Sequence, residues 1–189
     1  MMKRILVLLC LTLGHQSARC ASLSNSPEQH RSVYCNVYLA NACFGIARGD
    51  VVTMRIPVDF ITYEVELSGS AKVLIYSGYN PTRMPAEGGS DIQKFIVPSG
   101  SYDYVLTPDG KHVITYTSGD NKSPILQIVI DKISPSQKGL FADFLNAFRP
   151  CKNDGSGAVC DKEQVLFKDV AQKVFKKTGV ESKEIGSKR

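Results

Sequence analysis

The sequence has little histidine and lacks the short motif that marks the commonest serine hydrolases. Its 189 residues include three histidines and no G-x-S-x-G stretch, which a nucleophile elbow requires together with a histidine base. His30 lies in a polar N-terminal segment, and His112 alternates with Ile114 and Tyr116 as in a strand. Histidine in such a strand is usually structural, so we expect no catalytic residue and no enzymatic activity.

The cysteine spacing of a metal centre is also missing. None of the six cysteines forms a C-x-x-C pair, which is the usual spacing in structural zinc sites. The sequence therefore predicts neither a metal site nor a cofactor.

A long hydrophobic run is absent as well. The one clear run, Ile5 to Leu13, follows Lys3 and Arg4 and precedes a short polar stretch, which is the order of a secretory signal peptide. A membrane span needs about 20 apolar residues, so this run is too short for one. We expect a signal peptide over residues 1–22, cut after Cys20 or Ser22, and a mature chain that is periplasmic or secreted and has no membrane span.

A strong charge of one sign is missing from the predicted mature chain. The full sequence carries a formal charge of +5, but loss of residues 1–22 leaves 20 basic residues against 18 acidic ones. This near balance gives no basis for a nucleic-acid partner.

Four cysteines remain after the predicted cleavage, an even number that favours disulfides in an exported chain. Three pairings are possible. We favour the local one, Cys35–Cys43 with Cys151–Cys160, because each pair brackets a plausible turn.

The rest of the chain predicts an α+β fold, in which a mostly antiparallel sheet of about seven to eight strands precedes two C-terminal helices. We expect a flexible leader over residues 23–32, one domain over residues 33–179 and a disordered tail over residues 180–189. Alternating or continuous apolar residues predict strands at residues 33–39, 51–56, 60–67, 71–76, 92–97, 102–106, 111–117 and 125–130.

Helical spacing begins after residue 133. Ser134 offers an N-cap for a first helix that Pro150 would end. A second helix is expected to open at Asp161 and to close near Gly179, with Gln164 completing its cap. The loop closed by the second disulfide would then join the two helices.

A glycine- and proline-rich loop over residues 77–91 is the most distinctive surface feature. Long loops are often functional, and tyrosine and arginine are enriched in protein-recognition surfaces. The alternative is that the tyrosines pack the sheet. We expect a binding surface made of Tyr76, Tyr79, Asn80, Arg83, Met84, Tyr102 and Tyr104.

Two further patterns have simple structural explanations. Glu64 and Glu66 alternate on one strand, as on the solvated face of a sheet, although paired carboxylates also serve glycosidases. Arg48-Gly49-Asp50 spells a cell-adhesion tripeptide, but Gly-Asp between two strands is typical of a turn.

The sequence thus favours an exported, non-enzymatic binding protein, such as an inhibitor or an immunity protein that binds a secreted or periplasmic toxin or hydrolase. One alternative is a hydrolase that uses Glu64 or Glu66 with Asp103. Another is an accessory component of an envelope or secretion assembly. The partner and the oligomeric state stay open.

Overall fold

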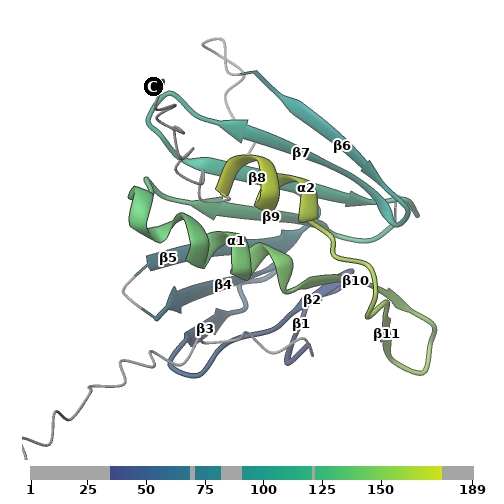
Figure 1. The fold of residues 1–189 in the computed structure, drawn as a ribbon. Helices are drawn as coiled ribbons and strands as arrows, with labels where there is room; N and C mark the ends of the chain where they lie inside the picture. Colours follow the sequence, from purple (N-terminus) through teal and green to yellow (C-terminus); the bar gives the residue numbers. More distant parts are fainter. Residues whose placement is uncertain (1–34, 69–70, 82–90, 121, 176–189) are drawn as a thin grey trace, which may run out of the picture.

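A seven-stranded antiparallel sheet forms the body of the molecule (Figure 1). The computed structural model describes residues 35–68, 71–81, 91–120 and 122–175. The strand order is β3-β4-β5-β9-β8-β7-β6. The strands are β3 (Val51–Arg55), β4 (Phe60–Leu67), β5 (Ala71–Gly78), β6 (Gln93–Val97), β7 (Gly100–Leu106), β8 (His112–Ser118) and β9 (Ile125–Ile130).

A smaller sheet of four short strands lies beside one end of the large one (Figure 1). Its order is β1-β2-β10-β11, again antiparallel. The strands are β1 (Val37–Tyr38), β2 (Ala42–Phe44), β10 (Phe148–Asn153) and β11 (Ala158–Cys160).

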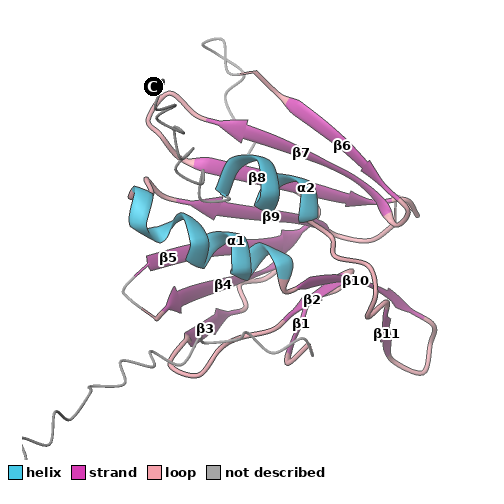
Figure 2. Cartoon of the chain, in the orientation of Figure 1, coloured by secondary structure: helices cyan, strands magenta, loops and turns pink. Residues whose placement is uncertain are grey.

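Two short helical segments cover one face of the large sheet (Figure 2). The first consists of a 3-10 turn, η1 (Pro135–Gln137), and α1 (Lys138–Asn146). The second is α2 (Lys168–Val170), which continues as the π-helical turn η2 (Ala171–Phe175). Alternate residues of the strands, such as Val65, Ile75 and Ile128, are fully buried beneath this layer. The period-two pattern therefore places the core between sheet and helices.

Phenylalanine rings join the two sheets through the helical layer. Phe44 of the small sheet stacks on Phe148 and meets Phe144 of α1 edge to face, with centroids 5.0 and 5.5 Å apart. Phe167 in turn contacts both Phe148 and Tyr102 of β7, each at 5.2 Å. Buried aromatic pairs add to the free energy of area burial, so this cluster fixes the small sheet against the large one.

The predicted α+β class and the antiparallel sheet are confirmed. Residues 60–67 and 125–130 form strands with the predicted bounds, and residues 125–130 lie at the centre of the sheet. The predicted strand count is too low, because the described residues form eleven strands in two sheets. The additional strands come from short segments that alternation does not mark as separate strands, and they pair only because distant segments meet.

The predicted second helix begins too early. Asp161 does cap a turn, since its Oδ1 accepts the backbone N–H groups of Glu163 and Gln164. No helix follows this cap directly, because the Leu166 N–H donates to the Phe148 carbonyl at 3.1 Å and holds the chain in a turn. Residues 166 and 167 are thereby buried, and the helix starts only at Lys168.

The disulfide-closed loop between the helices is a β-hairpin, which also corrects the predicted role of Pro150. Helix α1 ends at Asn146, and Pro150 lies inside β10, paired with Ala42 of β2. Cys151 and Cys160 face each other across β10 and β11. Their bond therefore closes this hairpin and does not link one helix to the next.

Several predictions concern residues outside the described ones. These are the signal peptide, the leader, the C-terminal tail, the end of the second helix at Gly179, and Arg83 and Met84 of the long loop. Among the helices that are described, none is long and apolar enough to cross a membrane.

Candidate binding site

A cavity of about 460 Å³ lies where the large sheet meets the disulfide-closed hairpin. One wall is formed by the turn between β6 and β7 together with the end of β8. The opposite wall is formed by β10, β11 and the capped turn that follows them. Ligand pockets commonly have a volume of about 300–1,000 Å³, so the cavity has the size of a binding site.

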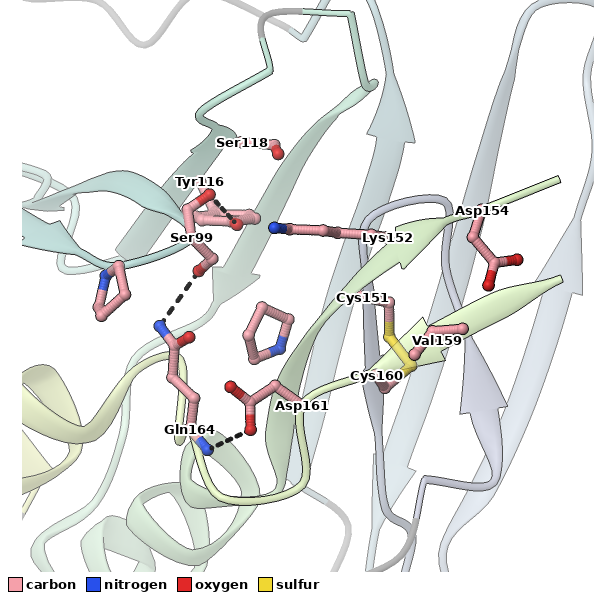
Figure 3. A pocket seen from close by; sticks show the side chains of 12 residues that line it. Ser99, Tyr116, Ser118, Cys151, Lys152, Asp154, Val159, Cys160, Asp161 and Gln164 are labelled. Carbon is pink, nitrogen blue, oxygen red and sulfur yellow. Dashed lines mark hydrogen bonds between the residues drawn. A yellow bond between two sulfur atoms is a disulfide. The ribbon is translucent and has the colours of Figure 1, made fainter.

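Ser99 connects the two walls. Its carbonyl accepts hydrogen bonds from the Tyr116 hydroxyl at 3.0 Å and the Gly119 N–H at 2.9 Å. Its own Oγ accepts a hydrogen bond from Nε2 of Gln164 at 3.2 Å, from the other wall (Figure 3). These contacts hold the β6–β7 turn against β8, and Gly100 permits the close approach because a Cβ there would lie 2.2 Å from the Thr117 carbonyl oxygen.

The hairpin wall is held by a buried arginine. Arg149 Nε donates to the Lys162 carbonyl at 3.0 Å, and its Nη1 donates to the Asn146 carbonyl at 2.6 Å. Burial lowers the pKa of the Arg149 guanidinium, and the negative charge of Asp161, a smaller effect, raises this pKa. This one side chain therefore ties the end of α1 to the capped turn, which makes the wall rigid.

Charges of opposite sign line the cavity. Figure 3 shows the Lys152 ammonium group extended from β10 toward Tyr116, and the Asp161 carboxylate beside Gln164. Both side chains are exposed. Apolar surface between them comes from Pro98, Pro150 and Val159.

The groups that line the cavity are of the kinds found in ligand-binding sites. Described residues around the cavity include no histidine, and both of its cysteines are joined in a disulfide, so it offers neither an imidazole base nor a thiolate nucleophile. A cation, a carboxylate, hydroxyl groups and an amide on apolar walls are the groups that orient a bound ligand.

Comparisons with family models, curated proteins and solved structures find no match.

Both predicted disulfides are confirmed, and they lie next to each other. Cys35 bonds Cys43 and Cys151 bonds Cys160. The sulfur atoms of Cys35, Cys43 and Cys160 all lie within 4.8 Å of one another. The N-terminal strands and the hairpin are thus covalently closed at the same place.

Tyr102 and Tyr104 are not surface residues, which corrects the predicted binding surface at these two positions. They are 1 % and 4 % exposed, because their positions on β7 face the helical layer. The Tyr104 hydroxyl pairs with Nδ1 of His112 at 2.8 Å. Burial, followed by the nearby charge of Lys138, lowers the pKa of His112, as expected for a structural histidine.

Three other residues of the predicted surface lie together at the end of β5. The Tyr76 ring packs on Phe60, and its hydroxyl accepts the Asn80 N–H at 3.2 Å. Tyr79 is 62 % exposed and donates to the Lys122 carbonyl at 3.2 Å. Strand pairing places this end of β5 beside the start of β9, at the same end of the sheet as the cavity.

The carboxylates of the alternative hydrolase are not brought together. Glu64 and Glu66 lie on β4 and Asp103 lies on β7, with β5, β9 and β8 between them. Four strand spacings amount to roughly 19 Å, too far for two carboxylates to share one substrate bond. Glu64 pairs instead with Lys72 at 3.7 Å.

The Arg48-Gly49-Asp50 segment forms a turn, as predicted. Gly49 adopts a positive φ of 93°. The two carboxylate oxygens of Asp50 accept the backbone N–H groups of Ala47 and Ser68, at 2.8 and 3.0 Å. The acidic group that an adhesion motif would present is therefore used within the fold.

Sequence reasoning missed the cavity itself. Its residues come from three separated stretches, near positions 98, 116 and 150–164. Lys152 carries no local pattern that distinguishes it from other surface charges, and the pattern around Asp161 indicates only a helix cap. The one available signal was the second cysteine pair, which marks the hairpin that forms half of the lining.

Proposed function

We propose that this protein is an exported, non-enzymatic binding protein that holds a protein partner at the cavity end of its large sheet. An inhibitor or immunity-type protein acting on a secreted or periplasmic toxin or hydrolase is the class that fits best. The observation that carries the proposal is the cavity, with the Lys152 ammonium and the Asp161 carboxylate on apolar walls.

The rigidity of the cavity supports this proposal. A preorganised site loses less conformational freedom when a partner binds. Here the Ser99 hydrogen bonds fix one wall, while Arg149 and the Cys151–Cys160 bond fix the other. The two disulfides also favour an oxidising compartment outside the cytosol.

Surroundings of the cavity favour a macromolecular partner. Tyr79 and Lys122 are exposed at the same end of the sheet, and tyrosine is enriched at protein interfaces. A partner side chain inserted into the cavity would act as an anchor, with these residues contacting the surrounding surface.

Charge reversal at Lys152 tests the proposal. The full chain is used to capture partners from the exported fraction of its source, and the purified partner is titrated by calorimetry. We expect Lys152→Glu to weaken binding by roughly tenfold or more. Lys132→Glu, an identical change just beyond the far end of β9, serves as the matched control and should leave affinity within about twofold.

Two outcomes would contradict the proposal. If Lys152→Glu and Lys132→Glu changed the affinity for the partner by the same factor, or both left it unchanged, the partner would not bind at the cavity. The chain could also hydrolyse polysaccharide or peptide and lose that activity in Glu64→Gln. The hydrolase alternative would then be favoured over the binding protein.

A further inference from the structure

One edge of the large sheet is left open by the described residues. Strand β3 is the last strand at that edge, and no other described strand pairs with its outer side. Four of its five residues are exposed. An exposed edge carries unpaired backbone N–H and C=O groups, which form a template for pairing with another strand.

Apolar side chains gather along this open edge. Val51 and Met54 of β3 are 58 % and 54 % exposed, and Ile56 and Val58, which follow the strand, are 66 % and 104 % exposed. Exposed hydrophobic groups that lie together commonly mark an interaction surface.

The opposite edge differs from β3 in the residues near the strand centre, although Ile96 there is 85 % exposed. Strand β6 carries Lys94 near its centre, a residue that discourages edge pairing. Its Phe95 is covered, since Lys173 lies 5.1 Å from the ring centroid and Tyr102 stacks on the ring at 4.8 Å. The centre of β3 is the uncharged Thr53.

We propose that β3 pairs antiparallel with β3 of a second copy of this chain, about a two-fold axis at Thr53. This register opposes Thr53 with the partner's Thr53 and Val52 with the partner's Met54. Thr–Thr and apolar cross-strand pairs both stabilise a sheet. The two seven-stranded sheets would become one continuous sheet, a closed isologous contact that does not propagate further.

Charge complementarity supports this partner and this register. Val51 faces Glu66 of β4, on the same side of the sheet as Thr53 and Arg55. In the dimer, Arg55 lies directly opposite the partner's Val51. The partner's Glu66 lies one strand further on, so two strand spacings, about 10 Å, separate it from Arg55. Two long side chains can span that distance across a valine, and symmetry makes the contact twice.

The Glu66 carboxylate is accessible for this contact with the partner's Arg55. Lys72 lies directly opposite it on β5, yet among the described residues Lys72 pairs with Glu64. Glu66 itself is exposed.

Because pairing of five-residue strands buries less area than a standard stable interface, the dimer should dissociate on dilution.

Cysteine cross-linking tests the register. Thr53→Cys places two thiols opposite each other across the axis, at the Cα separation of about 4.5–5.5 Å that suits a disulfide. We expect Thr53→Cys to form a covalent dimer under mild oxidation. Thr115→Cys, on the same face but in the interior strand β8, should remain a monomer. Equal cross-linking of the two variants would overturn the proposal.

A charge swap tests the partner. We expect Arg55→Glu and Glu66→Arg each to raise the dimer dissociation constant roughly tenfold in analytical ultracentrifugation. The double variant should restore the wild-type constant. A wild-type chain that stays monomeric at every concentration, or a double variant no better than the single ones, would overturn the proposal. These measurements use no ligand of the cavity, so their outcome is separate from that of the proposed function.

Discussion

At the scale of single residues, Gly100 shows how one missing side chain positions a wall of the cavity. Its backbone lies against β8 so closely that a Cβ would meet the Thr117 oxygen at 2.2 Å and the Gly119 nitrogen at 2.9 Å. Both contacts are backbone atoms, so relief requires movement of the strand itself.

We expect Gly100→Ala to lower the free energy of unfolding by about 2 kcal/mol or more, because the β6–β7 turn must move away from β8. Urea denaturation measures the change. Gly139→Ala is the matched control, since Gly139 lies in α1 and a Cβ added there would meet nothing within 4 Å. This control should gain up to about 1 kcal/mol of stability from helix propensity. A neutral Gly100→Ala would mean that the turn is not held against β8.

At the scale of elements, the disulfide-closed hairpin links stability to the cavity. Replacing both Cys151 and Cys160 with serine removes a cross-link between residues nine apart and should cost about 2–3 kcal/mol. Cys35→Ser with Cys43→Ser, which opens a loop of nearly equal length, should cost a similar amount. Double variants are needed because a single thiol left beside the other disulfide could exchange with it.

Only the first of these double variants should also weaken partner binding, because the Cys151–Cys160 bond lines the cavity and the Cys35–Cys43 bond does not. Calorimetric titration beside urea denaturation separates the two effects. Loss of binding in both double variants would show that overall stability, rather than the hairpin wall, determines affinity.

Elements also show where sequence patterns suffice and where they fail. Residues 60–67 and 125–130 could be predicted because their apolar patterns reflect burial against one helical layer. Asp161 and Gln164 give a correct local cap but a wrong helix start, because a hydrogen bond from Leu166 to the distant Phe148 holds the chain in a turn before Lys168. The cavity could not be predicted for the same reason, since Ser99 and Gln164 meet only in the folded chain.

At the scale of the whole molecule, buried tyrosines couple the fold to alkaline pH. Burial raises the pKa of Tyr63, Tyr104 and Tyr116 above 10.0. For Tyr102, burial and then the charge of Asp169 raise the pKa to about 12. Its hydroxyl is buried and makes no hydrogen bond of good geometry with the described residues, although it faces the N–H groups of Asp169 and Val170.

This pKa difference fixes the sign of the pH dependence. The folded chain keeps Tyr102 protonated to about pH 12, whereas the unfolded chain releases that proton near pH 10. The associated stability is therefore fully present below about pH 10 and is lost as the pH rises toward about 12. We expect urea denaturation at about pH 9 and about pH 11 to show this loss, and Tyr102→Phe to reduce it, because phenylalanine has no proton to lose. Removing the hydroxyl should change stability at about pH 9 only slightly, since it lacks a well-formed partner. An unchanged alkaline loss in Tyr102→Phe would assign the effect to the other buried tyrosines.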